Sequence, residues 1–225
     1  MKRFCLIVVA LLFPIVVCAQ QVTTFLGIPV DGSKSEMIQK LKAKGFRSTA
    51  THADVLEGEF NGQNVYIIVK TNKDKVYRIA VTDINSIDEA SIRIRFNRLL
   101  KQFEDNDKYV ASLLGNSYIS DDEDISYEIT VKSRRYEASF YQRTELLDSA
   151  LLNAYNYLKT RYTESQLVNA TDAMATDILE YTKLYLEPYL KTSVWFMISE
   201  AYQKGKYYIS LFYDNEYNMA NGEDL

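Results

Sequence analysis

The single histidine of the chain is the first residue that could support catalysis. His52 and Asp54 are two residues apart, so one continuous strand over 46–60 would place both side chains on the same face. A histidine base oriented by a carboxylate could then activate Ser48 or Thr51 as a nucleophile. Neither hydroxyl has a sharp elbow or a glycine-rich oxyanion setting around it. We therefore interpret His52 as a surface residue in a turn between two strands.

Pairs of carboxylates are the second possible source of chemistry. A glycosidase requires two Asp or Glu side chains held at a fixed separation. Glu128, Glu137 and Glu200 are candidates, because each falls in a segment with strand character. Glutamates on the outward face of a strand are usually solvated. We therefore favour a protein that is not an enzyme, and a carboxylate-dependent hydrolase acting on an envelope glycan is the alternative.

The residue types present argue against a metal site or a bound cofactor. One histidine cannot form a multi-histidine metal site. Residues 121–124 and 214–218 are rich in oxygen ligands for calcium. The first segment lacks the glycine and the alternate spacing of an EF-hand loop, and in the second Met219 occupies the glycine position. Phosphate-binding loops and dinucleotide fingerprints do not occur in the sequence. We predict no metal and no cofactor.

A basic stripe lies on one predicted helix of this acidic protein. Arg95, Arg98 and Lys101 fall on neighbouring turns, and Asp88, Glu89 and Glu104 lie nearby. The ordinary interpretation is a solvated outer face with balanced charge. The other interpretation is a docking edge for an anionic partner.

The first nineteen residues have the three parts of a secretory signal peptide. Two cations follow Met1, an apolar run extends to Val17, and Ala19 supplies the small residue before the cleavage site. The run is shorter than the roughly 20 residues that a membrane span needs. Val17 is too bulky for typical lipobox chemistry at Cys18, which argues against a lipid anchor. We predict export to the periplasm or outside the cell, with residues 1–19 removed.

Cleavage would change the chemistry available to the mature chain. Both cysteines, Cys5 and Cys18, lie in the signal segment, so the mature chain would be free of cysteine and could form no disulfide. Loss of Lys2 and Arg3 leaves 24 basic residues against 30 acidic ones, a net charge of about −6. This balance argues against a nucleic-acid partner. We also predict no transmembrane span in the mature chain.

Local patterns predict the elements of the first half of the chain. Ser33 and Glu36 form a capping box, and Gly45 stands where a left-handed residue would end the helix. Residues 86–89 form a second capping box, which opens a helix whose apolar stripe is Ile92, Phe96, Leu99 and Phe103. Strands are expected at 46–52, 54–60, 63–71 and 75–82, and the last two form the first predicted hairpin, which pairs 65–69 with 76–81.

The second half shows two further predicted hairpins. Residues 125–131 alternate between apolar and polar side chains, and 136–141 alternate again after a short turn. The third hairpin pairs 194–198 with 207–213. Helices are expected around 147–158 and over 172–187, the latter stopped by Pro188.

Hairpins thus recur about every 60 to 70 residues, with helices between them. This spacing suggests a hairpin-then-helix unit used about two and a half times, by duplication or by recurrence of a common motif. Because no flexible linker divides the chain, we predict one α+β domain over 20–225. It would have a largely antiparallel sheet, with helices packed mainly on one face. Two packed subdomains, 20–108 and 125–225, are the alternative.

The third hairpin is apolar on both faces. A strand at the centre of a sheet has this property when both of its faces are covered. The other explanation is a partly exposed aromatic surface, because fifteen of the eighteen tyrosines lie from Tyr118 onward. We expect the row of Val194, Phe196 and Ile198 to enter the core. Under a thinner cover, Trp195, Tyr208 and Phe212 would then be the candidate binding residues.

Three stretches, 17–20, 25–46 and 213–225, together resemble a family of uncharacterised exported proteins of gut Bacteroidetes. This resemblance implies a location in the cell envelope and no particular activity. The glycine-turn lead-in before a capped helix and a hairpin is also similar to the repeat of small outer-membrane assembly lipoproteins and of the β-lactamase-inhibitor protein. That second similarity concerns architecture alone.

A non-enzymatic binding or interaction module is the function that these observations favour. Its partner would be a protein, a peptide or a glycan, held by the tyrosine-rich C-terminal half. A self-associating structural protein of the envelope is a further alternative, which would need an exposed sheet edge at the third hairpin.

Overall fold

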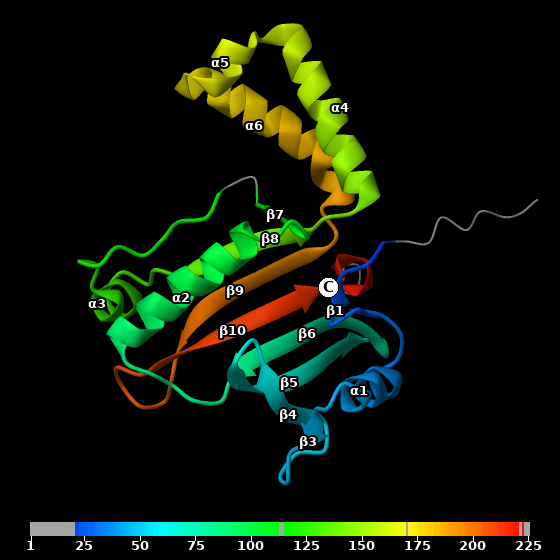
Figure 1. The fold of residues 1–225 in the computed structure, drawn as a ribbon, viewed down its shortest axis with the longest axis vertical. Coiled ribbons are helices and arrows are strands. Elements are labelled where there is room, and N and C mark those ends of the chain that lie inside the picture. Colours follow the sequence, from blue (N-terminus) through cyan, green and yellow to red (C-terminus); the bar gives the residue numbers. More distant parts are fainter. Residues whose placement is uncertain (1–20, 113–114, 170, 221, 223–225) are drawn as a thin grey trace, which may run out of the picture.

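The computed structural model describes residues 21–225, apart from 113–114, 170, 221 and 223–225. The predicted signal peptide, residues 1–19, lies outside the described residues. An antiparallel sheet of eight strands, in the order β3-β4-β5-β6-β10-β9-β8-β7, forms the centre of the molecule (Figure 1). The strands are β3 (Arg47–Ser48), β4 (Val55–Phe60), β5 (Gln63–Asn72), β6 (Lys75–Asp83), β7 (Tyr109–Ala111), β8 (Glu137–Gln142), β9 (Ser193–Glu200) and β10 (Tyr207–Asp214). A separate small hairpin joins β1 (Thr24–Phe25) to β2 (Ile28–Pro29).

The predicted α+β class, with a largely antiparallel sheet, is confirmed. The helices are α1 (Lys34–Ala43), α2 (Glu89–Glu104), α3 (Ile125–Thr130), α4 (Glu145–Arg161), α5 (Glu164–Val168) and α6 (Asp172–Leu186), and the 3-10 turns are η1 (Glu187–Tyr189) and η2 (Glu216–Asn218). No helix in the described part of the chain is both long enough and apolar enough to span a membrane.

Helix α1 begins and ends as its sequence predicts. Ser33 accepts a hydrogen bond from the backbone of Glu36, and the Glu36 carboxylate accepts one from the backbone of Ser33. At the other end Gly45 has a φ of 102°, and the Phe46 N–H donates to the Leu41 carbonyl at 3.3 Å. These bonds form a Schellman motif, which turns the chain sharply into β3.

Helix α2 begins two residues later than the predicted capping box. Asp88, and not Ser86, is the N-cap, and its carboxylate accepts from the backbone N–H of Ser91 at 2.9 Å. An aspartate is at least as good an N-cap as serine and adds a favourable charge at the helix N-terminus. The predicted apolar stripe is buried along its whole length: Ile92, Phe96, Leu99 and Phe103.

The predicted strand over 125–131 is wrong, because α3 is a helix. Asp124 caps α3 by accepting from the backbone of Tyr127 at 2.8 Å. Ile125 is buried and Ile129 packs against the core, whereas Val131 is exposed. Strand β8 therefore pairs with β7 and β9, and the predicted second hairpin does not exist. The predicted hairpin-then-helix repeat is therefore also wrong, because it depended on this second hairpin.

The helices α1 and α2 cover one face of the sheet. Met37 and Leu41 of α1 and Phe96 of α2 share one hydrophobic core with the inward rows of the central strands. Phe196 of β9 meets the Phe96 ring at a centroid distance of 5.0 Å. The predicted packing of helices on one face therefore holds for α1 and α2, whereas α4 and α6 pack together in a separate cluster.

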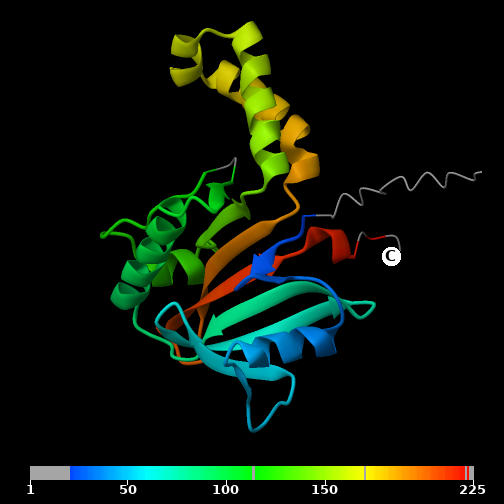
Figure 2. The ribbon, with the colours of Figure 1, turned by 45° about the vertical axis from the view of Figure 1, so that its right-hand side comes forward.

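A helical arm projects from the end of the sheet and contains α4, α5 and α6 (Figure 2). It lies in the chain between β8 and β9. Ala150 and Ala154 of α4 pack against Leu186 at the end of α6, forming a small core of their own. The arm thus adds a second, minor packing centre outside the sheet.

Candidate functional site

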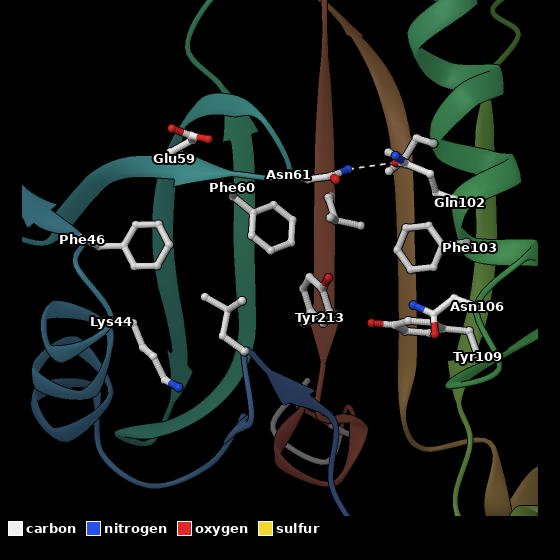
Figure 3. A pocket seen from close by; sticks show the side chains of 13 residues that line it. Lys44, Phe46, Glu59, Phe60, Asn61, Gln102, Phe103, Asn106, Tyr109 and Tyr213 are labelled. Carbon is white, nitrogen blue, oxygen red and sulfur yellow. Dashed lines mark hydrogen bonds between the residues drawn. The ribbon is translucent and has the colours of Figure 1, made fainter.

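A cleft of about 760 Å³ opens on the helix-covered face, between α2 and the β4–β5 turn. Strand β10 forms its floor, and the side chains of the two walls face one another across it (Figure 3). The lining residues come from both halves of the chain. They are Leu26, Lys44, Phe46, Glu59, Phe60, Asn61, Leu99, Gln102, Phe103, Asn106, Tyr109, Leu211 and Tyr213.

The first wall depends on the end of α1 and on the β4–β5 hairpin. The Schellman motif turns Phe46 inward, where it is 4 % exposed. Gly58 permits this position, because a Cβ atom there would lie 2.5 Å from the Phe46 ring. Phe60 packs on Phe25 with ring centroids 5.2 Å apart. An aromatic wall therefore stands beside the polar turn at Asn61.

The second wall is the C-terminal half of α2 and the segment that follows it. Phe103 meets Tyr109 edge to face with centroids 4.7 Å apart, and it stacks on Phe140 of β8 at 4.8 Å. Gln102 and Asn106 are exposed beside this aromatic group. The wall thus has an apolar base and a rim of carboxamides.

The floor of the cleft is formed by Leu211 and Tyr213. Tyr213 is 5 % exposed, and its ring lies 4.9 Å from that of Phe25. Burial raises the pKa of the Tyr213 hydroxyl well above its usual value, and the neighbouring Tyr109 raises it further. A tyrosine hydroxyl is protonated at physiological pH in any case, and this shift of the pKa keeps it protonated further into the alkaline range.

A hydrogen bond between Asn61 and Gln102 spans the two walls. The side-chain amide of Asn61 donates to Oε1 of Gln102 at 2.9 Å, as the dashed line in Figure 3 shows. Both residues are exposed, so water competes for the same groups. A ligand with amide or hydroxyl groups could replace this bond at little cost.

The side chains that line the cleft are suited to binding a ligand. Among the described residues that line it, Glu59 is the one carboxylate, and it is exposed. A glycosidase needs a second carboxyl group about 5 to 9 Å away. In the described residues we also find no group of three or more metal-ligating side chains. Aromatic contact, hydrogen bonding and the charges of Lys44 and Glu59 are the interactions that this cleft offers.

The predicted residues Trp195 and Phe212 lie on the opposite, more open face of the sheet. They pair across β9 and β10 and stack with ring centroids 4.2 Å apart. The Arg78 guanidinium lies over both rings, 4.9 Å from Phe212 and 5.3 Å from Trp195. Val194, Phe196 and Ile198 are buried, as predicted, and Trp195 is half-buried. Whether the aromatic pair binds a ligand stays a prediction.

Tyr208 is on the same open face but apart from that pair. It precedes Phe212 by four positions on β10, about 13 Å along the strand, and it pairs with Ser199. The structure therefore brings together two of the three predicted binding residues. Arg78, which completes their cluster, was not predicted, because its position over the rings depends on the β6–β10 pairing.

The predicted catalytic and calcium residues have structural partners. His52 contacts Thr51 at 3.0 Å, while Asp54 pairs with Lys34 at 2.6 Å, so His52 and Asp54 do not form a base-and-orienter pair. Asp122 accepts from Ser120, and Asp124 caps α3. The acidic segment 121–124 is thus engaged in local contacts.

The three predicted carboxylates lie at unrelated places. Glu128 is in α3, not in a strand, and pairs with Lys132 at 2.7 Å. Glu137 of β8 pairs with Arg135 at 3.0 Å. Glu200 is exposed at the end of β9. None of the three lines the cleft.

Two of the three residues in the predicted basic stripe on α2 are paired with nearby carboxylates. Arg95 makes two hydrogen bonds to the Asp83 carboxylate, at 2.6 and 2.7 Å, and Lys101 pairs with Asp105. Arg98 is exposed. The stripe is therefore largely a balanced face and not a continuous docking edge.

Comparison of the chain with protein-family models, curated proteins and solved structures finds no match. The cleft was not predicted from the sequence, although single signals for its walls were present. The sequence Asn61-Gly62 is a strong hairpin signal, and Phe103 belongs to the predicted apolar stripe. Their convergence depends on the order of the strands, which no local signal contains.

Proposed function

We propose that this protein is a non-enzymatic binding module that holds a short peptide segment in the cleft above β10. The volume and the lining of the cleft are the observations that support this proposal. Its volume of about 760 Å³ falls in the range typical of ligand sites, and its lining combines aromatic rings with a few convergent polar groups. The C-terminal half contributes the floor, through Leu211 and Tyr213.

The chemistry of the lining favours a peptide over a glycan. The carboxamides of Asn61, Gln102 and Asn106 offer donors and acceptors that match those of peptide bonds. The rings of Phe46 and Phe103 are almost fully buried, so they form the sides of an apolar hollow. A sugar ring stacks best on a flat, exposed ring face, whereas a hollow accepts an apolar side chain.

The two alternative functions have less support. A hydrolase would need a partner for Glu59, and the cleft lining supplies none. Self-association through the third hairpin would need an open edge, but β9 and β10 are central strands with partners on both sides. In β8, the backbone N–H of Ser139 donates to Oδ1 of Asn116 at 2.8 Å, and the side-chain amide of Asn116 donates to the Ser139 carbonyl at 3.1 Å. These two bonds keep the Ser139 backbone from pairing with a strand of another molecule.

Export to the cell envelope is part of the proposal. It is supported by the signal-like composition of residues 1–19. A binding protein without disulfides would then depend on its hydrophobic core for stability outside the cytoplasm.

Selection from a library of random heptapeptides displayed on phage tests the proposal. The decisive variant is Gln102→Trp, which fills the cleft from the rim of α2. Arg98→Trp is its matched control, because Arg98 is exposed on the same helix but does not line the cleft. We expect enriched peptides centred on an apolar residue that bind wild type and Arg98→Trp equally and bind Gln102→Trp at least about tenfold more weakly, about 1.4 kcal/mol. Equal binding to all three proteins would place the site elsewhere and refute the proposal.

A further inference from the structure

The turn between β1 and β2 holds a leucine in a backbone conformation that leucine rarely adopts. Leu26 has a φ of 51° and Gly27 a φ of 77°. Positive φ at both central residues is the signature of a type I′ turn, which prefers Asn-Gly. The β4–β5 turn has that sequence, with φ values of 50° at Asn61 and 70° at Gly62. In the left-handed region the Cβ of Leu26 crowds the following carbonyl oxygen.

Leu26 is also poorly buried. Its side chain is 41 % exposed and lines the cleft. Five non-glycine residues of the described chain have a positive φ, and Leu26 is the one apolar residue among them. The protein therefore retains both a strained backbone and an exposed apolar side chain at the same position, and neither favours folding.

The base of this turn is firmly anchored. Phe25 is fully buried, and its ring contacts those of Phe60 and Tyr213, with centroids 5.2 and 4.9 Å away. The Gln142 side chain holds Thr24 through its backbone N–H and carbonyl, both at 2.7 Å. Leu26 is thus presented to the cleft by a rigid support and not by a loose loop.

We infer that Leu26 is a ligand-contacting residue that covers an aliphatic or aromatic group of the ligand in the cleft. Strained residues concentrate at ligand clamps, where the surrounding structure holds them in place. An apolar ligand group beneath Leu26 would bury the side chain that the free protein exposes. This inference rests on the proposed function, since it assigns the apolar part of the peptide to the Leu26 side of the cleft.

The test compares two variants with wild type, using the fluorescent probe 8-anilinonaphthalene-1-sulfonate. Leu26→Asn places a residue that tolerates the left-handed region at the strained position and removes the apolar contact. Ser133→Asn is the control, because Ser133 has a φ of 56° but does not line the cleft. We expect both variants to raise Tm by about 2–4 °C. The affinity for the probe should fall about fivefold or more in Leu26→Asn alone.

The outcomes separate this inference from the proposed function. A raised Tm with unchanged probe affinity in Leu26→Asn would overturn the role of Leu26 and leave the cleft intact. A lowered Tm would show that Leu26 supports the fold, which also overturns the inference. If wild type does not bind the probe, or if Gln102→Trp binds it equally well, the probe does not occupy the cleft and the inference about Leu26 is overturned, whereas the peptide selection decides the proposed function separately.

Discussion

The indole N–H of Trp195 donates a hydrogen bond to Oδ2 of Asp214 at 2.9 Å. Asp214 is 2 % exposed and also receives two hydrogen bonds from the Arg78 guanidinium, at 2.6 and 2.7 Å. One buried carboxylate therefore fixes both the cation and the indole of the cluster on the open face of the sheet. This arrangement links the aromatic pair to the pairing of β6 with β10.

Asp214→Asn should destabilise the protein by about 3 kcal/mol. The change leaves the Arg78 charge partly buried without its counterion, and such losses cost about 3–5 kcal/mol when both groups are fully buried. Because the Arg78 side chain is 26 % exposed, we place the effect at the low end. The denaturant midpoint measures it. Asp54→Asn is the control, because the Lys34–Asp54 pair is exposed and its loss should leave the midpoint almost unchanged. Equal effects of the two substitutions would contradict this account.

Trp195→Ala should cost about 2–3 kcal/mol of stability, less than the 3–5 kcal/mol of a fully buried aromatic residue. Trp195 is half-buried, and the substitution removes its stacking on Phe212 and its bond to Asp214. Thermal unfolding measures the loss, and iodide quenching of the wild-type tryptophan measures exposure. Strong protection from iodide combined with a collapse in stability would show Trp195 to be a core residue, and the predicted binding surface would be lost with it.

Stability should fall at alkaline pH. Burial raises the pKa of Tyr213 well above its usual value, whereas the unfolded chain loses that proton near pH 10. As the pH rises above about 10 the unfolded state binds fewer protons than the folded state, so unfolding becomes more favourable. The hydrogen bond to Glu104 likewise raises the pKa of the exposed Tyr118, to about 12.

Tyr213→Phe tests the assignment of this pH dependence. The variant removes the buried hydroxyl, so its unfolding free energy should fall less steeply between pH 9 and pH 11 than that of wild type. Denaturant titrations at several pH values give the two slopes. Identical slopes would show that Tyr213 does not contribute.

Gly58→Ala should destabilise the protein by about 1–3 kcal/mol, because overpacking forces neighbouring atoms to move. The new Cβ would lie 2.5 Å from Cδ1 of Phe46, which forms a wall of the cleft. Phe46→Leu on the same background should recover part of the loss, since the smaller side chain relieves the contact. A double-mutant cycle of unfolding free energies measures the coupling. Strict additivity would exclude the predicted contact.

The mature protein should begin at Gln20. The apolar run and the small residue Ala19 predict cleavage after position 19. N-terminal sequencing of protein recovered from the envelope fraction of cells expressing the full chain provides the measurement. A sequence that begins at Met1, or a lipid-modified Cys18, would refute the prediction.

Several elements follow from local sequence alone. The capping box at Ser33 and the left-handed Gly45 set the limits of α1, since both act within one or two turns of the backbone. Alternation predicts β5 and β6. The third hairpin is central in the sheet, as one explanation of its two apolar faces predicts, but the face with Trp195 and Phe212 is only half-buried. These signals depend only on neighbouring residues and on side-chain periodicity.

The helical conformation of 125–131 and the formation of the cleft depend on tertiary structure. Ile125 and Ile129 are four residues apart, a spacing that fits both an alternating strand and one face of a helix. The Asp124 cap and the bond from the Ile125 N–H to Glu89 of α2, at 2.8 Å, favour the helix, and the second of these is a long-range contact. The cleft likewise joins Leu26, Asn61, Gln102 and Tyr213, which are brought together only when β10 pairs with β6 beneath α2. Such pairing depends on the packing of distant segments, and short-range sequence patterns carry no information about it.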